Sequence, residues 1–236
     1  MSLMITCLGD ALFPDVGVAT LRLLRRLGVE VDFPRAQTCC GQPFLNSGYR
    51  ENARDLARHT IRAFDNGQTI VTPSGSCAAM VKLEYPELLH DDLVWHDRAE
   101  NLAGRVHELS DFLVNVLGVQ EVGARFDGKA TYHMACHLRG LGIMTEPERL
   151  LRKVKGLQFV PLERADECCG FGGSFSVRYP GISGAMVADK AALIERTGAD
   201  AVVATDAGCL MNIAGCLRRR GSRVRALHLA ELLERT

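Results

Sequence analysis

The feature that most constrains this chain is a four-cysteine pattern that occurs twice. Each copy has one cysteine, a Cys-Cys-Gly triplet that begins 32 residues later, and a further cysteine after a short apolar run. The first cysteines of the copies are 129 residues apart, as are the triplets, and the last cysteines are 132 apart. The eight positions are Cys7, Cys39, Cys40 and Cys77, then Cys136, Cys168, Cys169 and Cys209. Repetition this regular predicts two copies of one structural unit, at residues 1–122 and 123–236.

Short apolar runs alternate with segments of helical periodicity in both halves. Three helical segments, 16–27, 52–64 and 185–196, are each followed within three residues by a glycine, a usual helix stop signal. Strands are expected at 3–7, 29–33, 69–72, 105–109, 130–135, 157–162, 201–205 and 223–227. Alternation of strand and helix is typical of parallel sheets covered by helices. The expected fold class is therefore α/β, with two pseudo-symmetric lobes, each a parallel sheet covered by helices.

The cysteines of each half follow the expected strands. Because the carboxyl ends of parallel strands meet at one sheet edge, we expect the four thiols of each half to lie together there. Four thiolates suit zinc or an iron–sulfur cluster. Structural zinc usually takes its ligands from closely spaced pairs, whereas only the vicinal cysteines are close here, which favours a cluster in each half. Zinc in at least one half and a catalytic thiol pair without metal are the alternatives.

The compartment of the protein bears on the state of these thiols. The N-terminal segment lacks the basic and apolar regions of a signal peptide, and no apolar stretch approaches the roughly 18 residues of a membrane span. We therefore expect a cytoplasmic protein whose nine cysteines stay reduced. The formal net charge is zero, which argues against a nucleic-acid or anionic-membrane partner. The ninth cysteine, Cys216, is seven residues beyond Cys209, and we interpret it as a packing residue.

Two segments of the second half resemble a known family. Residues 132–139 read Tyr-His-Met-Ala-Cys-His-Leu-Arg, and residues 168–175 read Cys-Cys-Gly-Phe-Gly-Gly-Ser-Phe. Together with the triplet at Cys39, they are similar to the cysteine-rich CCG-domain iron–sulfur proteins, and to the branch of that family that takes part in lactate utilization. The resemblance covers essentially the whole chain. It implies one [4Fe–4S] cluster per repeat, electron transfer during oxidation of L-lactate to pyruvate, and two partner subunits, at least one with ferredoxin-type clusters.

The chain departs from the resemblance in ways that keep other functions open. The CCG subunit of heterodisulfide reductase, a more distant relative, has a further cysteine in each repeat where this chain has Met80 and Asn212, so its disulfide chemistry does not carry over directly. The chain also lacks a C-x2-C-x2-C-x3-C-P run and a dinucleotide fingerprint, so we expect a redox subunit that does not oxidise a hydroxy acid alone. The alternatives are a thiol/disulfide redox subunit, the equivalent subunit of a glycolate or glycerol-3-phosphate oxidising complex, and a zinc-stabilised scaffold.

The two halves differ near their first cysteines. Only the second has histidines beside its first cysteine, His133 and His137, and it also has the denser glycine run after the triplet. These histidines are either ordinary strand and loop residues or groups that hydrogen-bond or ligate a cluster. Since hydrogen bonds and charge near the sulfurs tune cluster potentials, we expect the second half to hold the more easily reduced centre. The first half is then more structural, with zinc as an alternative occupant.

Overall fold

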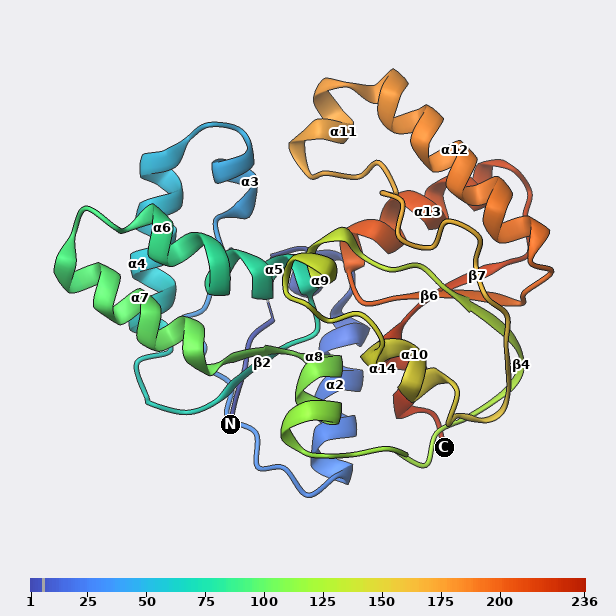
Figure 1. Cartoon of the computed structure of the whole chain (residues 1–236), viewed down its shortest axis with the longest axis horizontal. Helices are drawn as coiled ribbons and strands as arrows, with labels where there is room; N and C mark the ends of the chain where they lie inside the picture. The colour runs from blue at the N-terminus through green and yellow to red at the C-terminus, as the bar shows by residue number, and fades with distance from the viewer. Residues whose placement is uncertain (6) are drawn as a thin grey trace. The chain divides into compact units, whose positions relative to one another are not determined.

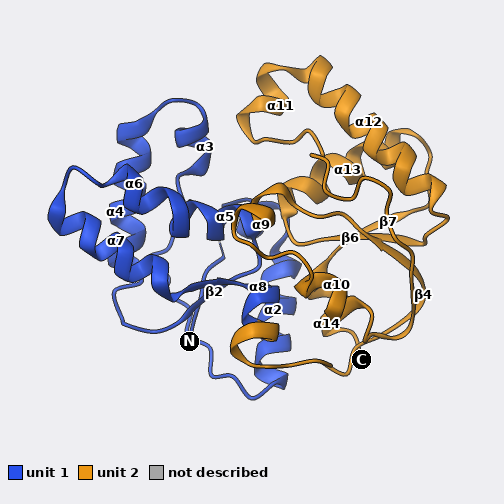
Figure 2. Ribbon diagram, viewed as in Figure 1, with its two compact units in different colours: residues 1–112 blue, residues 113–236 orange. Residues whose placement is uncertain are grey.

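The computed structural model describes residues 1–5 and 7–236. The chain divides into two compact units, Met1–Phe112 and Leu113–Thr236 (Figures 1 and 2). Each unit has a parallel sheet flanked by helices, so the α/β fold class is confirmed. The division of the sequence repeats between residues 122 and 123 stays a prediction.

The first unit is built on a three-stranded parallel sheet of order β1-β2-β3. The strands are β1 Ser2–Leu3, β2 Ile70–Thr72 and β3 Val106–Glu108. Strand β2 is buried along its length, as expected for the middle strand of a parallel sheet. The helices are α1 Cys7–Leu12, α2 Pro14–Arg26, α3 Gln42–Asn46, α4 Arg50–Ala63, α5 Gly75–Ala79, the π-helical η1 Met80–Glu84, α6 Tyr85–Leu88, α7 Leu93–Arg105 and α8 Leu109–Asp111.

The second unit is built on a four-stranded parallel sheet of order β5-β4-β6-β7. Its strands are β4 Arg125–Tyr132, β5 Lys155–Phe159, β6 Ala201–Ala204 and β7 Arg225–His228. Strand β6 is buried throughout, and its apolar side chains contribute to the core beneath helices α12 and α13. The helices are α9 Cys136–Gly140, α10 Glu146–Leu151, α11 Ser174–Arg178, α12 Pro180–Arg196, α13 Ala207–Arg219 and α14 Leu229–Glu234, and the π-helical η2 Phe112–Val116 begins at the boundary of the units.

Two expectations for the first half were wrong. Residues 29–33 do not form a strand, and Asp32 makes only an isolated parallel bridge with Ser2. None of those five residues is buried, so the apolar run has no core surface to pack against. The first strand ends at Leu3, and Cys7 begins helix α1 instead of ending the strand. Thr6, within the expected strand 3–7, lies outside the described residues.

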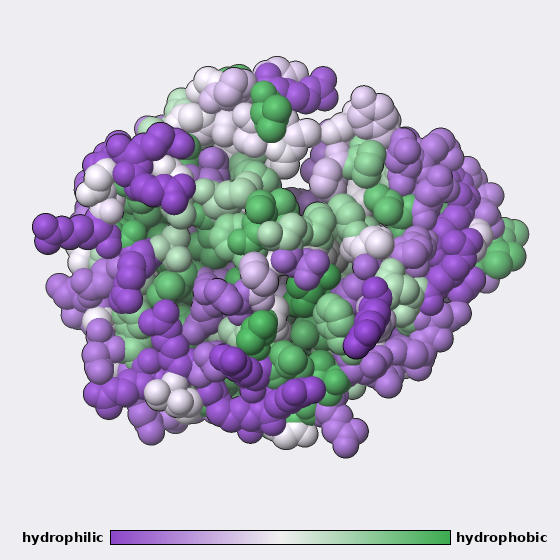
Figure 3. Space-filling model, turned by 180° about the vertical axis from the view of Figure 1, so that it is seen from behind, coloured by the Kyte–Doolittle hydropathy of each residue, from purple (hydrophilic) through white to green (hydrophobic). Residues whose placement is uncertain are grey.

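The surface of the molecule mixes polar and apolar side chains (Figure 3). Figure 3 shows apolar side chains among hydrophilic ones on one face. Among the described residues, no helix is both long enough and apolar enough to cross a lipid bilayer.

Candidate metal centres

The first four cysteines come together within the first unit. The Cys7 thiol donates to the Cys39 sulfur at 3.5 Å, and the Gly41 backbone N–H approaches the same sulfur at 3.5 Å. Cys40 hydrogen-bonds in turn to Cys39 and Cys77. Cys40 and Cys77 are buried, Cys39 is half-buried and Cys7 is exposed. The four sulfurs thus form a continuous group with one buried and one open side.

The second unit repeats this arrangement. The Gly170 N–H donates to the Cys168 sulfur at 3.3 Å, and Cys168 also hydrogen-bonds to Cys136 and Cys169. Cys169 in turn contacts Cys209. Cys169 and Cys209 are buried, whereas Cys168 is exposed. Both predicted quartets are therefore brought together, each within one unit.

The last cysteine of each quartet lies in the first turn of a helix. Ser74 caps α5, and its hydroxyl oxygen accepts from the Cys77 N–H at 3.3 Å. Asp206 caps α13, and its carboxylate accepts from the Gly208 N–H at 3.4 Å. Serine and aspartate are favoured at this position because their oxygens satisfy otherwise unpaired helix N–H groups. The caps fix where each helix begins and hence where its cysteine lies.

The glycine of each triplet allows a helix to pack close behind the cysteine pair. Gly41 and Gly170 have φ values of 90° and 80°, which a residue with a side chain rarely adopts. A Cβ on Gly170 would lie 2.8 Å from the Ser183 carbonyl oxygen on α12, and one on Gly41 would lie 3.4 Å from the Ala53 carbonyl oxygen on α4. The second site is thus the more tightly packed of the two.

Side chains outside the sequence motif hold the backbone of the buried cysteines. The Tyr85 hydroxyl donates to the Cys40 carbonyl at 2.8 Å, and the Asn212 amide donates to the Cys169 carbonyl at 2.8 Å. In the sequence, Asn212 is distinguished only as a position where a more distant relative has cysteine, and no pattern distinguishes Tyr85. The position of Asn212 three residues after Cys209, one helical turn away, was the signal that could have indicated its role.

The hydrogen bonds among the thiols select one thiolate in each quartet. The pKa of Cys39 is lowered to about 3, because its sulfur accepts hydrogen bonds from Cys40 and Cys7. The pKa of Cys168 is lowered to about 2 by the corresponding bonds from Cys136 and Cys169. The donor thiols have raised pKa values for the same reason, with burial as a further cause. The two centres therefore share one charge pattern.

A family model described as a cysteine-rich domain, CCG, matches residues 2–82 and 130–214, one match within each unit. The chain belongs to this cysteine-rich CCG family. The resemblance inferred from the two triplets is confirmed.

Curated CCG relatives match the chain along nearly its whole length. Lactate utilization protein A of Geobacillus thermodenitrificans is 52% identical over 234 residues, and the protein of that name from Bacillus subtilis is 50% identical over 234 residues. In both cases the match covers 99% of this chain and 98% of the relative. Among solved structures, an aspartate racemase homologue from Pyrococcus horikoshii superposes with a TM-score of 0.34 at 12% identity, covering 99% of this chain and 94% of that chain.

The second CCG unit has a buried histidine at its site. The ring of His133 and the sulfurs of Cys169 and Cys209 offer donor atoms within 4.8 Å of one another, and all three residues are buried. Burial, with the positive charge of Lys190 as a second cause, lowers the pKa of His133 to about 3. His137 lies on the other side of Cys136, with its Nδ1 3.7 Å from that sulfur. Both histidines named from the sequence thus lie beside the quartet.

Lys190 is a further CCG-site residue that the sequence did not suggest. Its side chain is buried, and its ammonium donates to the Arg164 carbonyl at 2.5 Å and approaches the Ala165 carbonyl at 3.5 Å. The Ala165 carbonyl also accepts from the Met134 N–H at 3.1 Å. Lys190 therefore joins α12 to the loop that leads to Cys168. A single lysine within a helical pattern gives no sequence signal of burial.

Cys216 shares the apolar core of the second unit with Cys169 and Cys209. It is buried in the apolar core of the second unit, among side chains such as Ile213 and Leu217 of the same helix. It is not part of the His133, Cys169 and Cys209 group. Its surroundings are those of a packing residue.

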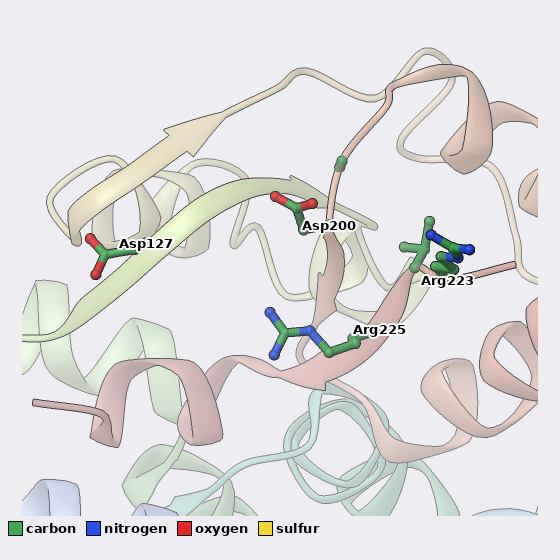
Figure 4. Close-up of a pocket in the computed structure, with 6 residues that line it drawn as sticks. Asp127, Asp200, Arg223 and Arg225 are labelled. Atoms are coloured by element: carbon green, nitrogen blue, oxygen red, sulfur yellow. The ribbon is translucent and has the colours of Figure 1, made fainter.

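The second CCG unit also has a depression at the opposite sheet edge. Its volume is about 430 Å³. Its charged lining residues are Asp127 near the start of β4, Asp200 just before β6, Arg223 shortly before β7, and Arg225, which begins β7 (Figure 4). Asp200 is engaged there, since its carboxylate accepts from the Lys129 N–H at 2.8 Å. The Arg225 guanidinium lies over the Phe126 ring, 5.3 Å from its centroid. Because the cysteines follow the carboxyl ends of the strands, this depression is separate from the cysteine site.

Proposed function

We propose that this chain is an iron–sulfur electron-transfer subunit of a complex that oxidises L-lactate to pyruvate. The observation that carries the proposal is the convergence of four thiols in each unit, in a chain about half identical to proteins named lactate utilization protein A. The proposed ligands are Cys7, Cys39, Cys40 and Cys77 in the first unit and Cys136, Cys168, Cys169 and Cys209 in the second.

The donor set fits an iron–sulfur cluster, and we propose one of the [4Fe–4S] type in each unit. Such a cluster supplies one-electron transfer, and four thiolates are its usual ligands. The residues of the chain would hold the cluster and limit the access of water. The buried pairs Cys40 with Cys77 and Cys169 with Cys209 form the protected side, and the exposed Cys7 and Cys168 form the open side. An open side suits exchange of electrons with a partner.

Metal content tests the cofactor directly. Protein purified without oxygen should contain iron and acid-labile sulfide, absorb in the visible range and give an EPR signal after reduction. Zinc without sulfide would instead support the zinc-stabilised scaffold. Zinc in the first unit together with a cluster in the second is compatible with the electron-transfer proposal.

The proposed partners are two further lactate-utilization subunits in the cytoplasm, at least one with ferredoxin-type clusters. The proposal is supported by the absence from this sequence of a dinucleotide fingerprint and of a ferredoxin-type cysteine run. Purified alone, the chain should not reduce artificial electron acceptors with lactate. Activity should appear when the partner subunits are added. Turnover by the isolated chain would contradict the role of electron carrier.

A thiol/disulfide redox subunit is the second candidate, and the lowered pKa of the exposed Cys168 favours it. A thiolate next to further thiols is the reactive form in disulfide exchange. Turnover of a disulfide substrate by the anaerobic protein, and loss of that turnover in Cys168→Ser, would support this candidate over the first.

A further inference from the structure

The second unit contains a buried imidazole whose hydrogen bonding is incomplete. His133 is 1% exposed, and among the described residues neither of its ring nitrogens makes a well-formed hydrogen bond, the Ala165 carbonyl offering only a weak one. The nearby Ala165 carbonyl already accepts from the Met134 N–H and lies close to the Lys190 ammonium. A buried polar group left unpaired is costly, so such groups usually have a partner that the protein alone does not supply.

The donor atoms of His133 are placed beside two buried sulfurs. One ring nitrogen of His133 and the sulfurs of Cys169 and Cys209 lie within 4.8 Å of one another. Three donors this close can contact one ion without large movement, because metal–nitrogen and metal–sulfur bonds are about 2.0 to 2.3 Å long. Cys168 hydrogen-bonds to Cys169, so its thiol is close enough to supply a fourth ligand to the same ion. A set of one imidazole and two or three thiolates is typical of divalent zinc and related ions.

The first unit lacks the imidazole. His133 stands three residues before Cys136, and the residue three before Cys7 is Met4, which is also buried. Both residues follow the first strand of their sheet in the order of the chain, β1 and β4, so the two positions correspond and differ in the donor that they offer. Zinc in proteins is bound by thiolate, imidazole and carboxylate groups, and a thioether is not among its usual ligands. The two units therefore present different donor sets on the buried sides of their quartets.

We propose that His133, Cys169 and Cys209 form a mixed imidazole–thiolate site that binds a single divalent transition-metal ion, Zn²⁺ or Fe²⁺, in the second unit. The two thiols lose their protons when the ion binds, and two thiolates with a neutral imidazole balance its charge. Because Cys169 and Cys209 are also proposed cluster ligands, the single ion would occupy this site only in protein that carries no cluster there. Where the proposed function holds, it is also the place where the second unit would capture its first iron.

The test uses Co²⁺ as a spectroscopic probe on the full chain, made metal-free and reduced without oxygen. The background variant Cys39→Ser/Cys40→Ser weakens the first quartet, so that the visible bands of bound Co²⁺ report the second unit. In this background, His133→Met, which copies Met4, should weaken Co²⁺ binding roughly 10- to 100-fold and shift the ligand-field bands. His90→Met, at an exposed position of the first unit, is the matched control and should leave the affinity and the bands unchanged. Circular dichroism checks that each variant is folded.

A second measurement needs no histidine variant. X-ray absorption at the zinc edge of the Zn²⁺-loaded background protein should show the scattering pattern of a coordinated imidazole. A sulfur-only environment would overturn the proposal, as would equal Co²⁺ affinity and spectrum in folded His133→Met. Separate reconstitution of the wild-type chain with iron and sulfide tests the proposed function. Failure to form a cluster, with an imidazole still seen on zinc, would reject the cluster and support the mononuclear site.

Discussion

The side-chain amide of Asn212 donates a 2.8 Å hydrogen bond to the backbone carbonyl of Cys169. The Tyr85 hydroxyl makes the equivalent bond to the Cys40 carbonyl, also at 2.8 Å. The two donors differ in chemistry and in sequence position, yet each restrains the backbone of the buried cysteine in its own quartet. The position of the cysteine pair is therefore held from outside the cysteine motif.

Loss of these bonds should weaken both folding and metal retention. Asn212→Ala and Tyr85→Phe each leave a cysteine carbonyl without its side-chain donor, so each should lower the free energy of unfolding by about 1 kcal/mol or more. Denaturant unfolding of the metal-free protein measures the effect. Asn101→Ala, which removes an exposed contact with Arg105, is the control and should change stability little. Unchanged stability in both site variants would show that these bonds do not restrain the cysteine pairs.

The two triplet glycines should differ in their tolerance of alanine. Gly41→Ala places an alanine in the left-handed region, which costs about 1–2 kcal/mol. Its Cβ would lie 3.4 Å from the Ala53 carbonyl oxygen, a tight contact but not a severe clash. Gly170→Ala has the same backbone cost, and its Cβ would also clash with the Ser183 carbonyl at 2.8 Å and the Met186 Cβ at 2.9 Å. We expect Gly170→Ala to be the more destabilising by at least about 1 kcal/mol in thermal or denaturant unfolding. Equal effects would mean that α12 moves away freely.

The sequence predicted the sheet type and the two cysteine groups because both depend on strong local patterns. The buried runs at β2 and β6 are apolar apart from Thr72 at the end of β2, and each capped helix start places its cysteine. Residues 29–33 show why an apolar run is insufficient, since a strand also needs a neighbouring core surface. The roles of Tyr85 and Lys190 could not be predicted, because each depends on a tertiary contact with a residue more than 20 positions away.

Burial of Glu108 predicts a dependence of stability on pH. Burial raises the pKa of this carboxyl from 4.5 to about 7, although the Ser110 N–H donates to it at 2.7 Å. Between pH 4.5 and about 7 the folded protein binds more protons than the unfolded chain, so the free energy of unfolding should fall as pH rises. The decrease attributable to this group is about 3 kcal/mol.

Glu108→Gln tests this dependence, because an amide cannot titrate and its oxygen still accepts from the Ser110 N–H. The variant should flatten the profile over that window and gain stability relative to wild type above pH 7. Denaturant unfolding at several pH values measures both effects. Glu121→Gln, at an exposed position, should follow the wild-type profile. A Glu108→Gln profile parallel to wild type would contradict the assignment.

The buried ammonium of Lys190 should raise the reduction potential of the second centre. Ser183 lies against Gly170 as Ala53 lies against Gly41, so the two positions correspond. Seven residues later the second unit has Lys190 and the first unit has Thr60. Only the second unit therefore has a cation at this position. Lys190→Met should lower the potential of that centre by on the order of tens of millivolts, as one charge does over roughly 10 Å at an effective dielectric constant of about 20. Redox titration followed by EPR measures it, with Thr60→Val as the matched control. An unchanged potential would assign Lys190 to structure alone.

Serine variants of the vicinal cysteines should show whether the two centres have different roles. The second has the buried cation Lys190 near its quartet, and this charge favours the more negative, reduced state of a cluster there. Cys168→Ser or Cys169→Ser should therefore abolish lactate-dependent electron transfer in the assembled complex. Cys39→Ser or Cys40→Ser should chiefly lower metal content or stability and leave a reducible EPR signal. If both pairs of variants remain folded and lose the redox signal equally, the centres are functionally equivalent, and the charge near the second quartet does not set its role.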